Sequence, residues 1–564
     1  MSDLRSSLGS VGRLLYGLLR RVFLREDLQF ILHCLFLLWM MTFLRPMFSA
    51  ATPTASYESF SIAWSLIAKD HALLLRLIQD QHFPLLQSLQ TLRQLLVLFL
   101  VIPTLVFVTT RRRLRWKDWE AGASLRVLVM VMLVALAWSG STFEYSIYLD
   151  RGHALDRLLL VALTALAWRT PLAVPFATRW AIVMLEEAYV PIPLDDFDFR
   201  SVAEVLIVFS CFTWASLLRS FKTKHFLLVG LGCWASYYYA AGMAKINYGP
   251  AWSWFLENHI SNIAANAHVR GWMSFLSDGT FSAAVAFIRR FDLALAAYTL
   301  MVELGALVVF VHPRIVRAWV GLCALLHFGI FAFTGIFFWK WLVTNLAFYF
   351  FLRYDGAAIA KQMCRRWLVV LFAITMVYDS RGRDYFYPQP RVAWYDSKFE
   401  ENYVLYAIGK SGHKYLVAPG YLTPMDMHWT QGRLCYATSE RSITGIYGTT
   451  GNYGVVKKLE VLATPEEALK LINSGYPCAN PTRQAVFDDF FVRYFGNLNR
   501  HDRELQWVSA VGAPRHLWVM PRGDLYDRQE PVEKIELWRD LVVNQGNALH
   551  HLEMKLVHTV LIPP

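Results

Sequence analysis

The residue of this chain best suited to chemistry is a lysine at the end of an apolar segment. Lys245 lies in residues 234–254, which read WASYYYAAGMAKINYGPAWSW. Placing an ammonium group in hydrocarbon costs roughly 2.5 kcal/mol or more, so such a lysine usually faces a polar cavity and has a function. Desolvation can lower the pKa of a buried lysine to about 5–6, which makes a neutral amine available as a base near pH 7. The structural alternative is that the side chain reaches from the helix end to the lipid headgroups.

Three further titratable residues lie in or beside apolar runs. His153 precedes a run that begins near residue 155, where a histidine is either functional or caps the helix. Glu303 and His327 lie in consecutive runs, 10 residues before and 14 residues after Pro313, where the chain turns back. At ~1.5 Å per residue their depths differ by only ~6 Å, so we predict that the two side chains contact each other. Such a pair could serve a reaction or only hold two helices together.

The composition indicates a membrane protein. Hydrophobic residues make up 55% of the 564 residues, and the mean hydropathy is +0.33. With 21 Trp and 38 Phe, this is typical of a chain that crosses a lipid bilayer several times. Residues 1–26 are basic and lead into the first apolar run without a cleavage site, so we expect no removable signal peptide. The net charge of +12 comes mostly from short loops, which favours cytoplasmic loops over nucleic-acid binding.

Apolar runs predict membrane helices over residues 29–44, 95–110, 125–140, 155–168, 202–218, 226–245, 291–311, 316–338, 341–352 and 367–377. An eleventh segment, 171–190, contains three charged residues and could cross, re-enter or lie on the surface. A crossing is favoured, because only then are the basic loops 111–117 and 219–224 both cytoplasmic. This topology places the N-terminus inside and everything after residue 377 outside. Between the first two runs, residues 56–93 suit an amphipathic helix at the interface.

The same topology brings two candidate residues to one membrane face. His153 and the end of the helix that carries Lys245 both lie on the outer side. Residues 248–290 are too polar for lipid and too aromatic for a free loop, so we expect helices that roof a pocket, with an aromatic interface belt as the alternative. In the first case Asn247 and Trp252 line the pocket wall.

Residues 379–564 have the composition of a soluble domain that is long enough for its own core. Strands are predicted over 402–417, 457–463, 515–520, 533–537 and 552–562, and helices over 464–473 and 481–495. The first of these helices opens with the capping box Thr464-Pro465-Glu466-Glu467. We therefore expect an extracytoplasmic α+β domain after a basic cytoplasmic segment, 1–28, and a polytopic α-helical membrane domain of about 10–11 helices, 29–378.

Two sets of side chains in the C-terminal domain are relevant to covalent and metal chemistry. Cys435 and Cys478 are its only cysteines and could form a disulfide in an oxidising compartment. His551 and His558 lie on opposite faces of a predicted strand, so we predict no metal site there.

Two sequence elements carry a resemblance to a known family. One is Ala-Gly-Met-Ala-Lys-Ile-Asn followed by Gly-Pro-Ala-Trp, around Lys245, and the other is GIFAFTGIFFWKW after His327. They resemble the HTTM family, the membrane domain shared by vitamin K-dependent gamma-glutamyl carboxylase and its bacterial relatives, over roughly residues 29–352. The resemblance matches His153 to a family histidine at the outer start of a helix. It also matches Glu303 and His327 to an acidic residue and a histidine in consecutive helices.

The resemblance implies that Lys245 deprotonates a reduced quinone similar to vitamin K hydroquinone. Oxygen then adds to the quinone, and the resulting alkoxide drives carbanion formation on a peptide or small-molecule substrate that captures carbon dioxide. The chain departs from the family where Ala244-Lys245 replaces two lysines in tandem, and where Asn247-Tyr248-Gly249-Pro250 replaces an acidic follow-on. We therefore still expect Lys245 to abstract a proton. The resemblance does not extend to carboxylation of a peptide glutamate.

We thus expect a multi-pass membrane enzyme of the lyase or oxygenase type, without a metal and without a nucleic-acid partner. Its expected catalytic residues are Lys245 and His153, supported by Asn247, Trp252, Glu303 and His327. The competing interpretation is a transporter or scaffold in which the same polar groups line a path through the membrane. A transporter predicts repeated helix patterns, and the sequence shows none, which favours the enzyme.

Overall fold

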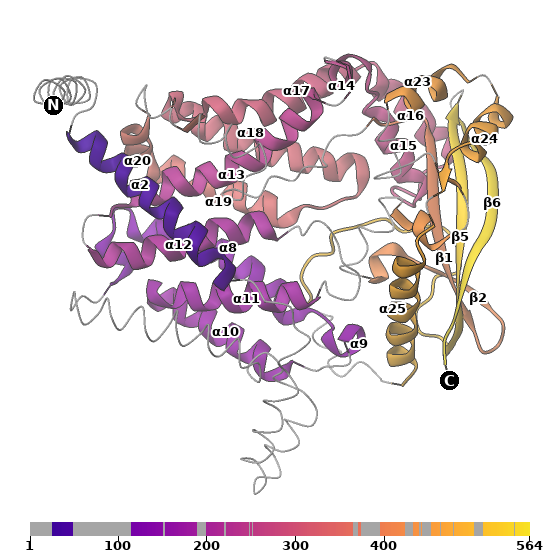
Figure 1. Ribbon diagram of the computed structural model, residues 1–564, viewed down its shortest axis with the longest axis horizontal. Helices are drawn as coiled ribbons and strands as arrows, with labels where there is room; N and C mark the ends of the chain where they lie inside the picture. The colour runs from indigo at the N-terminus through magenta and orange to yellow at the C-terminus, as the bar shows by residue number, and fades with distance from the viewer. Residues whose placement is uncertain are drawn as a thin grey trace, which may run out of the picture.

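A bundle of helices and a small β-sheet domain lie end to end in the structure, a computed structural model (Figure 1). The structure describes residues 25–48, 114–149, 153–188, 199–218, 221–247, 249–250, 252–364, 370, 372–373, 395–422, 433–438, 441–442, 453–462, 464–477, 479–500, 511–545 and 548–563.

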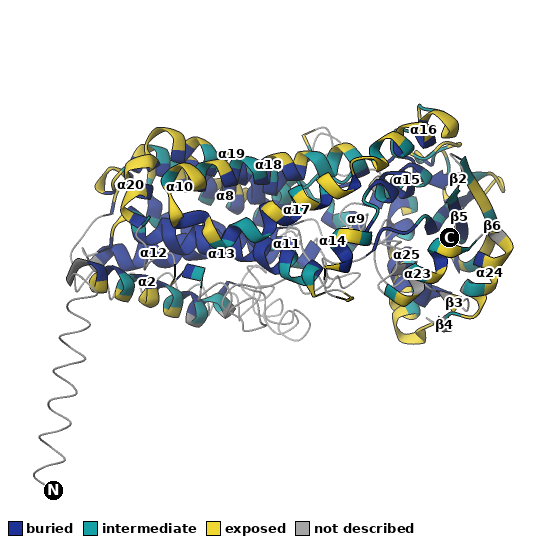
Figure 2. Cartoon of the chain, turned by 90° about the horizontal axis from the view of Figure 1, so that it is seen from above, coloured by how far each residue is buried: buried dark blue, intermediate teal, exposed yellow. Residues whose placement is uncertain are grey.

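The bundle is built around two helices that are buried along almost their whole length. α12 (Arg200–Ala215) and α13 (Thr223–Ile246) are apolar nearly all round, which is typical of helices that other helices enclose. Figure 2 shows both in the dark blue of buried residues. The helices around them are α2 (Arg25–Leu44), α8 (Gly122–Thr142), α10 (Ala154–Arg169), α11 (Val174–Ala188), α17 (Asp292–Gly305), α18 (Pro313–Thr334), α19 (Trp339–Tyr354) and α20 (Gly356–Met363).

Three helices of the described part are long and apolar enough to cross a membrane. They are α8, α18, and α17 with its 3-10 continuation η6 (Ala306–Val311). The outer helices also expose large apolar side chains, among them Trp39, Leu158 and Phe328. An exposed apolar surface of this kind indicates membrane association.

The helices predicted for the bundle lie within a few residues of their expected positions wherever the structure describes them. The uncertain segment 171–190 forms α11, which packs against α8 and α12. The helices expected over 56–93 and 95–110 lie outside the described residues, as does most of 367–377.

The C-terminal domain contains a four-stranded antiparallel sheet of order β2-β1-β5-β6. Its strands are β1 (Phe399–Gly409), β2 (Lys414–Val417), β5 (Val532–Gln545) and β6 (Ala548–Leu561). On one face, Phe487 and Phe491 of α25 (Pro481–Arg500) pack against Leu405 and Leu537. Tyr148 of the short helix α9 (Tyr145–Leu149) belongs to the same core. This core therefore ties the sheet domain to the bundle.

Three strand predictions for this domain need correction. The run 402–417 is a hairpin, β1 and β2, rather than one strand. Residues 457–463 fall mostly in a helix, α23 (Tyr453–Val461), because Leu459 and Leu462 pack on one side, against Phe399. Residues 515–520 join no strand of the sheet. Their backbone bonds instead to the bundle, from Trp518 N to Gly335 O at 2.9 Å and from Phe337 N to His516 O at 2.6 Å.

The remaining local predictions for the C-terminal domain fit the structure. The capping box is present at α24 (Pro465–Asn473), where Thr464 N and Glu467 N each bond to the side chain of the other residue. Cys435 is disulfide-bonded, and Cys478, its predicted partner, lies outside the described residues. The bundle cysteines, all in the described part of the chain, form no disulfide: Cys34, Cys211, Cys233, Cys323 and Cys364.

The segment predicted to roof a pocket forms three helices between the bundle and the sheet. They are α14 (Ser253–Glu257), α15 (Ser261–Val269) and α16 (Asp278–Arg289). α15 packs against α18 on one side and against β1 and β5 on the other. The contacts between this segment and the C-terminal domain are polar. Asn258 and Asn262 bond to Asp396 at 2.7–3.0 Å, and Arg270 pairs with the buried Glu400.

Glu400 makes the stability of this interface dependent on pH. Burial raises its pKa from 4.5 to about 8, although Arg270 acts in the opposite direction. The folded state therefore holds a proton that the unfolded chain releases, and stability falls as the pH rises from about 4.5 to about 8. The slope is at most roughly 1.4 kcal/mol per pH unit.

Glu400→Gln keeps a neutral partner for Arg270 and is expected to remove this slope. The measurement is the thermal unfolding midpoint of purified protein between pH 5 and pH 8. Glu466→Gln, an exposed carboxylate in the first turn of α24, is the control and should keep the wild-type slope. An unchanged slope in Glu400→Gln would show that Glu400 is ionised throughout this range.

Candidate active site

Lys245 is held in a buried ion pair at the end of α13. Its Nζ lies 2.7 Å from Glu303 Oε1, and both side chains are buried. Gly242 allows this approach, because a Cβ there would lie 2.9 Å from Leu304 Cδ2 and 3.0 Å from Glu303 Cβ. Nζ also lies 5.4 Å from the ring centroid of Trp254, within cation–π range. Lys245 is therefore enclosed by α13, α14 and α17 and does not extend to the surface.

The predicted contact between Glu303 and His327 is wrong. Glu303 bonds to Lys245, and His327 Nε2 lies 2.9 Å from the hydroxyl of Tyr238. Both partners belong to α13, so each residue interacts with this helix rather than with the other. The similar depths of Glu303 and His327 did not specify the direction of either side chain around its helix axis.

His327 is part of a buried hydrogen-bonded chain that links α13, α18 and α19. Tyr238 OH accepts a bond of 2.8 Å from Asn345 Nδ2, and Asn345 Oδ1 accepts one of 2.8 Å from Trp234 Nε1. The ring of Trp341 lies 5.1 Å from that of His327. Sequence reasoning missed Trp234, Tyr238 and Asn345.

A signal for two of these residues was present in the sequence. Trp234, Tyr238, Gly242 and Lys245 recur at spacings of four, four and three, so they share one face of α13. This face contacts the three helices that carry Glu303, His327 and Asn345.

Two buried polar atoms near this face have no hydrogen bond within the described part of the chain. They are Glu303 Oε2 and His327 Nδ1. A buried acceptor or donor without a partner costs about 1–3 kcal/mol, so such atoms need an explanation. A bound polar ligand would provide one.

His153 lies in a separate buried cluster at the same end of the bundle. It is the N-cap of α10 in the left-handed conformation, with φ 50°. Its Nδ1 is 3.0 Å from Asp156 Oδ2, and its Nε2 is 3.5 Å from Glu187 Oε1. Among the described residues no hydrogen bond or ion pair joins His153 to Lys245. Glu303 therefore takes the place beside Lys245 that was expected for His153.

The expected wall residues do not enclose Lys245 either. Asn247 is the exposed C-cap of α13, and Trp252 is 49% exposed. Trp252 adopts a left-handed conformation, φ 63°, immediately before α14, and Trp254, two residues later, packs against Lys245. Because α14 begins at Ser253, Trp254 lies against Lys245, whereas Trp252 precedes the helix and is exposed.

The C-terminal domain contacts the helix that carries Trp254. Glu257 of α14 accepts bonds from Tyr453 OH at 2.7 Å and from Lys457 Nζ at 2.6 Å, both in α23. Tyr395 packs with Trp254 in one cluster and bonds to Ser253. The roof over Lys245 is thus formed jointly by the bundle and the C-terminal domain.

Within the described ranges, no group of three His, Cys, Asp or Glu side chains is placed to hold a metal ion. His551 bonds to Asp540 at 2.9 Å, and His558 bonds to Asp488 at 2.6 Å, so the two histidines have separate partners.

The chain was compared with protein-family models, with curated proteins and with solved structures. No family model matches it, and no curated protein or solved structure does either. The interpretation of the site therefore depends on the geometry of this chain.

Proposed function

We propose that this protein is a membrane enzyme of the HTTM type in which Lys245 takes a proton from a reduced quinone. The observation that carries the proposal is the buried pair of Lys245 and Glu303, 2.7 Å apart. When the proton between them resides on Glu303, the pair is uncharged and Lys245 is a neutral amine. Such an amine can accept a proton from a bound hydroxyl group. Glu303 can later donate the proton that it holds.

The surroundings of the pair fit a ligand that is both aromatic and polar. The ring of Trp254 lies 5.4 Å from Lys245 Nζ, and the ring of Trp341 lies 5.1 Å from that of His327. Glu303 Oε2 and His327 Nδ1 are buried without partners in the described part of the chain and suit the hydroxyl groups of a hydroquinone. When bound, a reduced quinone would supply the acidic hydroxyl and the electrons for dioxygen. Carbon dioxide is a co-substrate only if the enzyme also deprotonates a carbon acid.

The small molecule that co-purifies with the full chain tests the assignment. We expect mass spectrometry of a solvent extract to identify a quinone. The molar ratio of this quinone to protein should be lower for Glu303→Leu than for the wild type, because this variant lacks a polar partner for the quinone. A matched control is Glu530→Gln, an exposed carboxylate of the C-terminal domain. A bound polar solute in place of a quinone would support the carrier interpretation instead.

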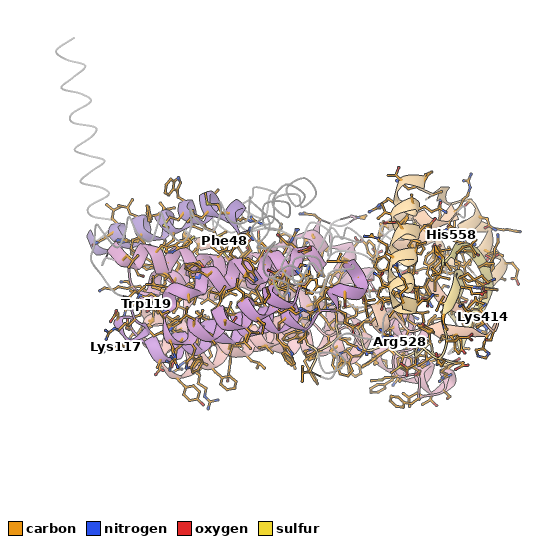
Figure 3. The ribbon with its side chains drawn as sticks, turned by 90° about the horizontal axis from the view of Figure 1, so that it is seen from below. Phe48, Lys117, Trp119, Lys414, Arg528 and His558 are labelled. Carbon is orange, nitrogen blue, oxygen red and sulfur yellow. The ribbon has the colours of Figure 1, made fainter. Side chains whose placement is uncertain are left out.

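We also propose a multi-pass topology with the N-terminus in the cytoplasm and the C-terminal domain outside. Lys117, from a basic loop, lies at the end of the bundle away from the sheet that carries Lys414 and His558 (Figure 3). Basic loops favour the cytoplasm, so the opposite end should face outward.

Reporter fusions after Pro564 test this topology. A reporter that is active only outside the cytoplasm should show activity there, and a fluorescent protein that requires the cytoplasm should stay dark. The reverse pattern would place Lys245 at the cytoplasmic end and would contradict the proposed orientation.

A further inference from the structure

A segment of the C-terminal domain, residues 511–522, lies across the ends of two helices that are long and apolar enough to cross a membrane. Ala513 N donates a bond of 3.1 Å to Thr142 Oγ1, at the last residue of α8. Trp518 N donates one of 2.9 Å to Gly335 O, immediately after the last residue of α18. The two helix ends therefore lie at the same end of the bundle, and the segment is fixed to both.

The lengths of α8 and α18 place this segment at the surface of a bilayer. α8 has 21 residues and α18 has 22, so at about 1.5 Å per residue each is about 31–33 Å long. The hydrocarbon core of a bilayer is about 30 Å thick. A helix of this length that begins at one boundary of the core ends close to the other. Residues 511–522 therefore lie at the level where the lipid chains join their headgroups.

Buried and exposed side chains alternate along this segment. Leu517 and Val519 are buried in the protein, whereas Trp518 and Met520 each expose about half of their surface. This period of two is typical of an extended chain that packs one face against a core. The outward face thus carries two large apolar side chains in successive positions.

Trp518 extends the exposed apolar side of α18. Leu325 and Phe328 are exposed on this helix, and Phe331 follows Phe328 by three residues, so it lies on the same side. The ring centroid of Phe331 is 6.3 Å from that of Trp518. The surface that α18 would present to lipid therefore continues onto the C-terminal domain.

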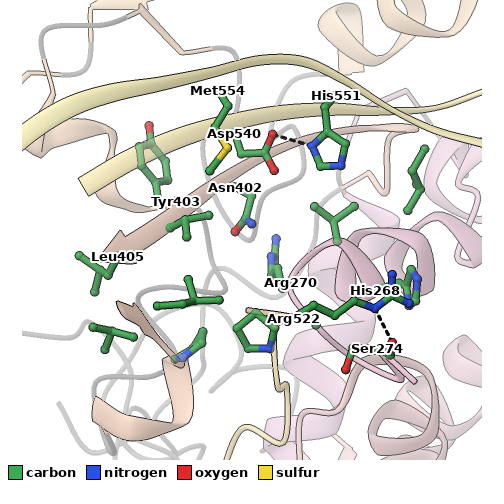
Figure 4. A pocket seen from close by; sticks show the side chains of 18 of the residues that line it. His268, Arg270, Ser274, Asn402, Tyr403, Leu405, Arg522, Asp540, His551 and Met554 are labelled. Carbon is green, nitrogen blue, oxygen red and sulfur yellow. Dashed lines mark hydrogen bonds and ion pairs between the residues drawn. The ribbon is translucent and has the colours of Figure 1, made fainter. Parts of the chain in front are cut away.

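Basic residues flank the two apolar side chains. Arg515 is exposed and forms no ion pair within the described part of the chain. Arg522 Nε donates a bond of 2.6 Å to Ser274 O, which ties the loop before α16 to the segment (Figure 4). Phe275, the next residue of this loop, is 83% exposed. Aromatic and basic side chains together are typical of the boundary between hydrocarbon and headgroups.

We propose that residues 511–522 insert into the surface of the lipid bilayer. The side chains of Trp518 and Met520 lie among the upper parts of the lipid chains, and Arg515 lies among the phosphate groups. The C-terminal domain thus binds the membrane directly as well as through the bundle. This inference rests on the proposed crossing of α8 and α18, but not on its orientation or on the chemistry of Lys245.

The test is a nitroxide spin label attached to Met520→Cys in the full chain, with Trp518→Cys as a second labelling position. The protein is placed in nanodiscs of phosphatidylcholine and phosphatidylglycerol. Electron paramagnetic resonance then measures how often the label collides with dioxygen, which concentrates in lipid, and with a nickel chelate, which stays in water. Wild-type protein, treated in the same way, gives the background from native cysteines.

Leu556→Cys is the matched control, because Leu556 is also an exposed apolar residue but lies on β6, which is remote from the bundle (Figure 1). We expect the ratio of dioxygen to nickel collisions to be severalfold higher at positions 518 and 520 than at position 556. Equal ratios at all three positions would show that the segment is in water and would overturn the inference.

Phe328→Cys, on the exposed side of α18, separates this inference from the proposed membrane crossing. If the label at position 328 prefers dioxygen and the labels at 518 and 520 do not, the crossing stands and the insertion of the C-terminal domain is wrong. If the label at 328 resembles the label at 556, α18 does not face lipid, and both the crossing and the insertion are wrong.

Discussion

Replacing Lys245 with methionine is expected to destabilise the protein by about 3–5 kcal/mol, because it leaves the Glu303 carboxylate buried without its cation. Both side chains are almost fully buried, and Glu303 Oε2 already has no partner among the described residues. The loss of Lys245 would therefore leave both carboxylate oxygens unsatisfied. Chemical unfolding in mixed micelles measures the change.

The double variant Lys245→Met with Glu303→Leu is expected to recover most of this loss, because apolar residues of similar volume can replace a buried ion pair at little cost. Arg493 and Asp489 provide an exposed control pair on α25, 2.9 Å apart, for which Arg493→Met should cost under about 1 kcal/mol. Additive losses in the double variant would mean that Lys245 and Glu303 do not interact.

The positions of the helices could be predicted from sequence because long apolar runs leave few alternatives. The capping box at Thr464 is similarly local, and its two reciprocal bonds form as expected. The wrong strand predictions involve short apolar runs whose structure is decided by distant partners. Leu459 packs onto Phe399, about 60 residues away, and His516 bonds to Phe337 of the bundle. Neither partner is visible in the local pattern.

The site was predictable in its residues more than in its contacts. Lys245, Glu303 and His327 stand out because charged or polar groups are rare in apolar helices. Their pairing was not predictable from depth, because depth along a helix does not fix the direction of a side chain around it. The four-residue spacing from Trp234 through Tyr238 on α13 provides that direction, since it identifies the face that meets α17, α18 and α19.

Lys245→Arg is expected to lower turnover by about 10²–10⁴-fold, the usual contribution of a positioned base. Arginine keeps the positive charge and can bond to both oxygens of Glu303, so folding should be preserved. It does not release a proton near neutral pH and so cannot provide a neutral amine. Lys340→Arg is the matched control, because Lys340 is also buried and lies 4.9 Å from the ring of Trp339. Its turnover should stay close to that of the wild type.

The most direct measurement is oxygen uptake by purified wild-type protein, Lys245→Arg and Lys340→Arg, each supplied with the same reduced quinone in the same detergent. Thermal unfolding of each sample and mass spectrometry of its bound quinone establish that the proteins are folded and loaded. We predict uptake by the wild type and by Lys340→Arg, and none above background by Lys245→Arg. Uptake by Lys245→Arg at the wild-type rate would contradict the role of Lys245 as the base.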